Sequence, residues 1–257
     1  KTTTTALFPF LSYCLRPSIN NPEFADVILR FRQKRTSISV SNEPQKDEDS
    51  LFYAHQAILT SRSYYFRKAL SSIEQSTETN LPECLIEEEV TPQFFAELLK
   101  YIYTGEHIPS MFERNTQSLI TFFGIQGYTQ IRLWGTEAEM SLCFQRLVNN
   151  PKYSDCILKV DKSLFYAHKV FLCRISFFRS LWSGNWKETG SVDEQHRSIV
   201  DLTHNVSSLA ITIWLQFLYA NKLSIPNLDV ALECLSLATF YVMEDMQFLV
   251  EAYIAAQ

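Results

Sequence analysis

An aspartate and a histidine recur as a pair at two places in the chain. The first pair is Asp26 with His55, and the second is Asp155 with His168. An imidazole oriented by a carboxylate is the proton-transferring half of a hydrolytic triad, so such pairs could support general-base catalysis. No nucleophile is placed with either pair. We therefore expect no catalysis and interpret all four side chains as parts of a hydrogen-bonded framework that occurs twice in the chain.

The pairs recur because the segments around them recur. The segment Ile-Asn-Asn-Pro-Glu-Phe-Ala-Asp-Val-Ile-Leu at 19–29 returns as Val-Asn-Asn-Pro-Lys-Tyr-Ser-Asp-Cys-Ile-Leu at 148–158. The tetrapeptide Phe-Tyr-Ala-His at 52–55 is repeated unchanged at 165–168. Solenoid repeats have periods of about 20 to 50 residues, and the longer spacing here matches an independently folded domain. The sequence therefore predicts two tandem copies of one domain.

We place the first domain at residues 6–134 and the second at 135–257. The first copy carries an insertion at 32–51 that is polar and mixed in charge, which predicts a solvated loop. A modification site or a partner-binding segment is the alternative for this insertion. Because the chain begins at Lys1 and carries no secretory leader, we expect a fragment of a longer intracellular protein, cytoplasmic or nuclear.

Composition narrows the class of protein. The chain has 257 residues, of which 46% are hydrophobic, enough to fill two cores. The net charge of -5 and the lack of a basic cluster argue against nucleic acid as a partner. The most apolar segment, Leu209–Ala220, is too short for a membrane span and predicts a buried helix. The six cysteines form no CxxC pair, so we expect reduced, buried thiols and neither a metal nor a cofactor.

Hydrophobic periodicity predicts the same elements in both copies. A short amphipathic helix comes first, and then a strand in which Val27, Leu29 and Phe31 alternate with other residues. The Phe-Tyr-Ala-His segment is the predicted hairpin partner of that strand. Two short helices follow in each copy. The expected N-cap of the second one is Ser63 in the first copy and Ser176 in the second.

The second half of each copy reads as a third strand and three further helices. We expect that strand near residues 84–87 and 198–202. Thr91 and Pro92 are the cap and first residue of the next helix, which Gly105 ends in a left-handed conformation. The second copy has Asn221 at the matching place, the next-best residue for that conformation. A last pair of helices completes an α+β fold, a small sheet beside a cluster of helices.

Four ordered motifs in each copy resemble the BTB/POZ domain. Those of the first copy are Ala-Asp-Val-Ile-Leu at 25–29, Phe-Tyr-Ala-His-Gln-Ala-Ile-Leu at 52–59, Ser-Tyr-Tyr-Phe-Arg at 63–67 and Leu-Lys-Tyr-Ile-Tyr-Thr-Gly at 99–105. Those of the second copy are Ser-Asp-Cys-Ile-Leu at 154–158, Phe-Tyr-Ala-His-Lys-Val-Phe-Leu at 165–172, Ser-Phe-Phe-Arg at 176–179 and Gln-Phe-Leu-Tyr at 216–219.

This resemblance implies a non-enzymatic interaction module. Domains of this kind dimerise, and many recruit the N-terminal domain of cullin-3 into a ubiquitin ligase. In that case, regions outside this fragment would bind the substrate that is ubiquitinated. The tandem arrangement resembles the group that includes the inhibitor of Bruton tyrosine kinase and fungal tandem-BTB proteins. The alternative is a scaffold or transcription-associated oligomerisation module that binds no cullin.

The resemblance also marks a candidate cullin-binding site. In adaptors of this kind, the loop after the third helix has the pattern hydrophobic-x-Glu, which Trp186, Lys187 and Glu188 match in the second copy. An exposed indole can fill a pocket on a partner helix, and aromatic anchors dominate interface energies. The first copy has Ile73 at this place, but an amide replaces the carboxylate. Alternatively, Trp186 packs on its own domain beside Trp182.

A second implied site is a charged pocket near the dimer interface. The resemblance assigns to it Asp26 and His55 in the first copy, and Asp155, His168 and Lys169 in the second. Only the second copy keeps a basic residue after the histidine, because the first has Gln56. The two copies could pair within one chain as an internal pseudo-dimer, or each could pair with another chain.

Overall fold

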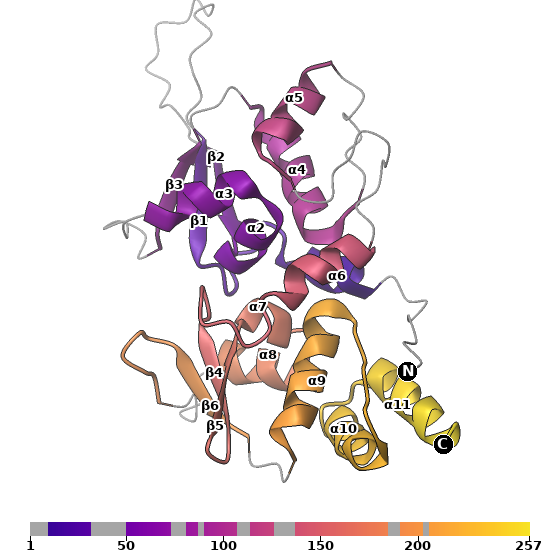
Figure 1. Ribbon diagram of the computed structural model, residues 1–257. Coiled ribbons are helices and arrows are strands. Elements are labelled where there is room, and N and C mark those ends of the chain that lie inside the picture. Colours follow the sequence, from indigo (N-terminus) through magenta and orange to yellow (C-terminus); the bar gives the residue numbers. More distant parts are fainter. Residues whose placement is uncertain are drawn as a thin grey trace, which may run out of the picture. The chain divides into compact units, whose positions relative to one another are not determined.

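We describe the protein from a computed structural model (Figure 1). The described part of the chain forms two compact units, and each is described by itself. The first unit contains the described residues between 16 and 125. The second unit contains those between 137 and 257 together with helix α1 (Phe10–Leu15). The described residues are 10–31, 50–72, 81–86, 90–106, 114–125, 137–184, 191–202 and 206–257.

The first unit is built on a three-stranded sheet. Strand β1 (Val27–Phe31) pairs antiparallel with β2 (Ser50–Ala54) and parallel with β3 (Glu83–Ile86), so the spatial order is β2-β1-β3. The predicted strand, its hairpin partner and the third strand are all confirmed. Strand β2 begins at Ser50 and so includes the last two residues of the predicted insertion. Residues 32–49 of that insertion lie outside the described part.

Helices cover this sheet (Figure 1). The Thr91 hydroxyl accepts a hydrogen bond from the Phe94 N–H at 3.2 Å, and Gly105 ends that helix with φ 69°. Both of these predictions are confirmed. The described helices of this unit are η1 (Arg16–Ser18), α2 (Gln56–Arg62), α3 (Tyr64–Ala69), η2 (Leu70–Ser72), α4 (Pro92–Thr104) and α5 (Arg114–Phe122).

The second unit repeats this architecture. Its sheet has the spatial order β5-β4-β6, with β4 antiparallel to β5 and parallel to β6. Asn221 takes the left-handed conformation predicted for it, with φ 50°. The elements are α6 (Glu137–Gln145), β4 (Cys156–Val160), β5 (Ser163–Ala167), α7 (Lys169–Leu172), α8 (Ser176–Ser183), β6 (Ser198–Asp201), α9 (Ser208–Ala220), α10 (Leu228–Phe240) and α11 (Glu244–Ala255).

The two copies differ at the start of their third helices. Ser63 is the N-cap of α3, and its hydroxyl accepts from the Phe66 N–H at 3.2 Å, as predicted. The matching prediction for Ser176 is wrong, because Ile175 is the N-cap of α8 and Ser176 is the first helical residue. In the second copy the extended residue that separates the two helices is Ile175, whose side chain is buried instead of capping the helix.

Aromatic side chains fill both cores. In the first unit, the rings of Phe31 and Phe95 are 4.3 Å apart between centroids. In the second unit, Phe171 stacks on Tyr219 at 4.2 Å, and Trp214 stacks on Tyr241 at 5.2 Å. Aromatic pairs contribute about 1 kcal/mol each beyond the burial of their area, so these contacts favour one packing over others. Among the described helices, none combines the length and apolar character that crossing a membrane requires.

Helix α1 packs in the second unit, where it contacts α6. Its last residue, Leu15, is fully buried. The sequence identifies this helix by its apolar spacing, but the spacing does not say which unit covers it. The predicted domain limits at 6, 134 and 135 remain predictions, because residues 1–9 and 126–136 lie outside the described part.

Candidate interaction sites

The repeated Asn-Asn-Pro segment shapes the same loop in each copy. In the first, Asn20 has φ 49°, and its side-chain oxygen accepts a hydrogen bond from the Tyr53 N–H at 2.9 Å. In the second, Asn149 has φ 53° and accepts from Tyr166 at the same distance. Asparagine is one of the few residues that tolerate this left-handed conformation. The repeat is therefore explained by local geometry, since one side chain both permits the turn and holds the neighbouring strand.

Each aspartate of the predicted pairs caps the helix that follows β2 or β5. The Asp26 carboxylate accepts the Gln56 N–H at 2.7 Å, and the Asp155 carboxylate accepts the Lys169 N–H at 2.7 Å. The histidines at these helix starts make no capping bond through their side chains. A carboxylate at a helix N-terminus satisfies an unpaired N–H and interacts favourably with the helix dipole. Each aspartate therefore caps the helix N-terminus, although the N-cap position itself is occupied by the histidine.

Each histidine is hydrogen-bonded to a buried tyrosine rather than to its aspartate. The His55 backbone N–H donates to the Tyr103 phenolic oxygen at 2.9 Å, and the ring nitrogen Nδ1 of His55 lies 2.8 Å from the same oxygen. His168 and Tyr219 repeat the arrangement at 2.7 and 3.0 Å. His168 Nε2 lies 3.2 Å from the Lys152 carbonyl oxygen, which can only accept a hydrogen bond. The neutral His168 ring therefore carries its hydrogen on Nε2, and its Nδ1 accepts from the Tyr219 hydroxyl.

Burial keeps these histidines neutral. It lowers the pKa of His55 and of His168 to about 4, although a carbonyl from Glu23 or Lys152 acts in the opposite direction. Burial also raises the pKa of the partner tyrosines. A neutral ring whose Nδ1 is occupied by a buried phenol connects the hairpin to α4 or α9. This arrangement is a structural tie between elements far apart in the sequence.

The charged pocket predicted for the second copy has its residues close together. Burial raises the pKa of Asp155 to about 6, while the Lys169 N–H and ammonium act in the opposite direction. The Lys169 ammonium lies 5.4 Å from the ring centre of Trp182, a cation–π distance. In the first copy, the Gln56 amide instead donates to the Asp26 carbonyl at 3.1 Å. The role of these residues at a dimer interface remains a prediction.

The four residues predicted to bind cullin lie outside the described part of the structure. They are Ile73, Trp186, Lys187 and Glu188. The structure describes the chain on both sides of the Trp186 segment, because α8 ends at Ser183 and the described chain resumes at 191.

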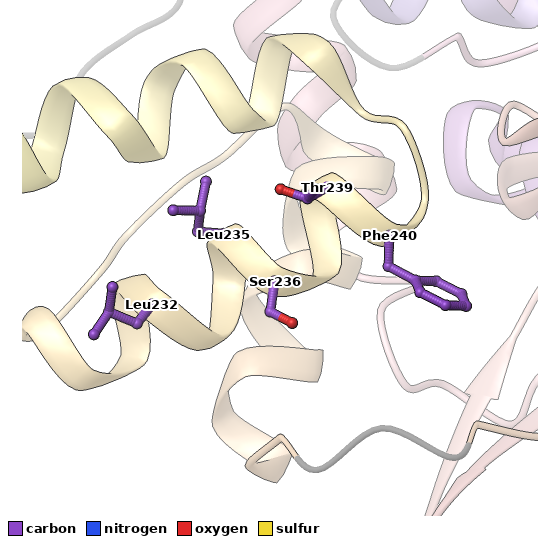
Figure 2. Close-up of a pocket in the computed structure, with 5 residues that line it drawn as sticks. All are labelled: Leu232, Leu235, Ser236, Thr239 and Phe240. Atoms are coloured by element: carbon purple, nitrogen blue, oxygen red, sulfur yellow. The ribbon is translucent and has the colours of Figure 1, made fainter.

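The second unit has a group of exposed apolar side chains on α8, α10 and the turn after α10, which we call the apolar patch. Phe177 on α8 is 44% exposed, and its ring centre lies 5.6 Å from that of Tyr241. On α10, Leu232 and Phe240 line a shallow pocket together with Leu235, Ser236 and Thr239 (Figure 2). Clustered apolar exposure of this kind marks interaction sites. The patch consists of Phe177, Leu232, Phe240 and Val242.

Val242 is the most unusual member of the patch. It is 71% exposed and adopts φ 54°, a conformation that is strained for a β-branched residue. Its counterpart after α5 is Gly124, with φ 53°, for which that conformation costs little. Sequence reasoning missed the patch. The available signal was the row Leu228, Leu232 and Phe240, which gives α10 apolar residues on more than one face.

The sheet order, the helices around it and the duplicated polar framework define the class of protein. A family model for the BTB/POZ domain matches residues 16–127 and again 144–257, and the chain belongs to this family. BTB/POZ domains are protein-interaction modules that self-associate.

Individual relatives match only part of the chain. One is "Armadillo BTB Arabidopsis protein 1" from Arabidopsis thaliana, 30% identical over 114 residues. The match covers 44% of this chain and 14% of that relative. Among solved structures, the BTB domain of zebrafish PATZ1 is 20% identical, with a TM-score of 0.35, and the match covers 47% of this chain and 89% of that domain.

Proposed function

We propose that this chain is the adaptor module of a cullin-3 ubiquitin ligase and that its second BTB segment binds the cullin-3 N-terminal domain. Substrate would be captured by regions outside this chain. The observation that carries the proposal is the apolar patch on α8, α10 and the turn after α10. One of its members, Phe177, is on α8, the helix that precedes the Trp186, Lys187 and Glu188 segment in the chain.

The patch suits a helical partner. Phe177, Phe240 and Val242 belong to two helices and a turn that meet around the buried ring of Tyr241. Apolar side chains that converge from separate elements form a shallow surface, and an amphipathic helix can cover such a surface with its apolar face. We propose that Trp186 adds an aromatic anchor and Glu188 a charge to the contact with cullin-3.

The main test measures affinity for the purified cullin-3 N-terminal domain by calorimetry with the full chain. Replacing Trp186→Ala should weaken binding about 30-fold, which corresponds to about 2 kcal/mol. Ile73→Ala, at the matching place in the first copy, is the comparison: an effect below twofold restricts the contact to the second segment, and a loss as large as that of Trp186→Ala would mean that the first segment binds as well. Unchanged affinity for Trp186→Ala would remove this residue from the interface.

A second pair of variants tests the patch. Phe177→Ala should weaken cullin binding about tenfold, because it removes a ring from the proposed contact surface. Leu164→Ala is a matched control, since Leu164 on β5 is also apolar and about half exposed but is not part of the patch. Equal effects of the two variants would argue against a localised site. If the wild-type chain does not bind cullin-3 at all, the scaffold or oligomerisation alternative replaces the proposal.

A further inference from the structure

The side chain of Met243 has an unusual partner. Its thioether sulfur accepts a hydrogen bond from the indole N–H of Trp214, with 3.0 Å between Nε1 and Sδ. Trp214 is fully buried on α9, so this N–H cannot reach water. A thioether is a weak acceptor, whereas buried donors are usually paired with oxygen. The contact therefore holds the sulfur in one orientation and covers one of its lone pairs.

The first copy has neither a sulfur nor an indole at this place. The matching residues are Leu98 and Ile125, and both are buried. The match is counted from the N-caps of α4 and α9 and from the left-handed residue of the turn before Ile125 and Met243. Because an apolar pair fills this place in the first copy, packing alone does not require a thioether beneath an indole N–H.

The backbone of Met243 is held on both sides. Its N–H donates to the Ala238 carbonyl at 2.8 Å, and its own carbonyl accepts from the Gln247 N–H at 2.9 Å. Met243 is also the N-cap residue of α11. Since both backbone groups are bonded, the main chain fixes where the side chain begins, and the Trp214 N–H fixes where it ends.

The side chain of Met243 also borders an open space. It lines a cavity of about 300 Å³ together with Cys14, Arg174 and others, and it is partly exposed. The other methionines in the described part of the chain are Met140 and Met246, and both are fully buried. Met246 lines the same cavity, but none of its surface is exposed. A dissolved oxidant therefore reaches Met243 before the other two.

The cavity contains a donor that suits an added oxygen atom. Arg174 donates through Nη1 to the Leu218 carbonyl, but its buried Nε has no hydrogen-bond partner within the described residues. A buried N–H without an acceptor is costly, and the oxygen of a sulfoxide accepts hydrogen bonds far better than a thioether does. Room is sufficient, because one water molecule occupies only about 30 Å³ in the liquid.

From these contacts we propose that Met243 is a site of reversible oxidation that yields a single epimer of its sulfoxide. The lone pair of the sulfur that faces the cavity attacks a hydroperoxide. The S–O bond forms, the O–O bond breaks, and the hydroperoxide leaves as an alcohol, or as water if it was hydrogen peroxide. Sulfur loses two electrons and the peroxide gains them. The other lone pair is covered by Trp214, so oxygen is added from one side only.

The first measurement is the rate of oxidation at each methionine. The full chain is treated with hydrogen peroxide, then with dithiothreitol to return oxidised cysteines to thiols, and its peptides are quantified by mass spectrometry. Met243 should be oxidised about tenfold faster than Met140 and Met246, because only its side chain is partly exposed. In urea, all of these rates should be similar. Equal rates in the folded chain would refute the site.

The second measurement is the configuration at sulfur. Methionine sulfoxide reductases A and B each reduce one epimer, so treating the oxidised peptides with either enzyme gives the ratio of epimers. In the peptide with Met243, one enzyme should remove nearly all of the sulfoxide. After oxidation in urea, each enzyme should remove about half.

A pair of variants tests the role of the indole. Trp214→Phe removes the N–H and uncovers the second lone pair, so both epimers should form at Met243. Tyr241→Phe is the control, because Tyr241 stacks on Trp214 and lines the cavity but does not contact the sulfur through a hydrogen bond that the structure shows. It should keep the single epimer. Slow oxidation of Met140 and Met246 verifies that each variant is folded. Both epimers in the folded wild type, or one epimer in folded Trp214→Phe, would overturn the proposal.

Discussion

The two units agree in their buried polar framework and disagree on their surfaces. Both use an asparagine in a left-handed turn, an aspartate that caps a helix, and a histidine bonded to a buried tyrosine. They differ where these elements meet solvent. The helix after the hairpin starts with Gln56 in one copy and Lys169 in the other, and the turn after the fifth helix has Gly124 or Val242. The bonds required for folding have been kept, while the positions available to partners have changed.

The turn residues show this most sharply. Gly124 and Val242 adopt nearly the same φ, and each donates its N–H to the carbonyl of a threonine three residues earlier. A side chain at position 124 would place its Cβ 2.9 Å from the Cβ of Tyr64, closer than such atoms approach. The first copy therefore requires glycine. The second copy accepts a strained valine, whose apolar side chain is 71% exposed.

Exchanging these two residues is expected to give the largest effect. Gly124→Val should lower the free energy of unfolding of the first unit by about 3 kcal/mol, through strain and the collision with Tyr64. Val242→Gly should instead raise that of the second unit by about 1 kcal/mol, since glycine removes the strain. Urea denaturation combined with hydrogen exchange measures both. Losses of similar size at the two sites would mean that the turns are equivalent after all.

Acid should affect the two units unequally. An unfolded histidine has a pKa of about 6.5, so the lowered pKa values of His55 and His168 stabilise each unit above that pH. This contribution is lost as the pH falls from about 6.5 towards 4, by roughly 2 kcal/mol per histidine at pH 5. In the second unit, the raised pKa of Asp155 opposes the loss, because the folded state binds its proton first as the pH falls through about 6.

Hydrogen exchange on α4 and α9 between pH 7 and 5 reports on the two units separately. We expect the first unit to lose more stability than the second. His55→Gln should reduce the pH dependence of α4 and leave that of α9 unchanged. If α9 loses protection faster than α4 as the pH falls, proton binding by Asp155 does not offset the stability that the second unit loses through His168.

Substituting the capping aspartates should have the smallest effects on stability, and the effects should be similar in the two units. Asp26→Asn and Asp155→Asn keep the shape of the side chain but remove the charge that faces the helix N-terminus. Each should lower the free energy of unfolding by about 1 kcal/mol at pH 7. Because burial raises the pKa of Asp155, its neutral replacement should cost less than that of Asp26. Thermal unfolding of both variants checks the order, and a larger loss at Asp155 would contradict it.

The sequence predicted most of the fold because each copy marks its elements with local chemistry. Thr91 caps the start of α4, and Gly105 ends this helix in a left-handed conformation. Asn221 ends α9 in the same way. Ser176 misled the prediction because the second copy shifts its extended residue to Ile175. A serine near a helix start says nothing about which residue takes the extended conformation.

The candidate sites were less predictable. The aspartates and histidines stood out through repetition, but their actual partners, a helix N–H and a buried phenol, depend on tertiary contacts. The unit that receives α1 and the exposure of Phe177 and Val242 are also tertiary properties. An apolar residue looks the same in sequence whether its neighbours cover it or leave it in solvent.

The position of α1 has a consequence for biosynthesis. This helix is synthesised before the rest of the second unit, including α11, whose Met246 lines the same cavity as Cys14. At about 5 to 20 residues per second, the gap lasts on the order of ten seconds or more. During that time the first BTB segment can already fold, while α1 has nowhere to dock and displays Leu15 to chaperones. The second unit therefore closes only after α11 has been synthesised, and its closure brings together segments that are far apart in the chain.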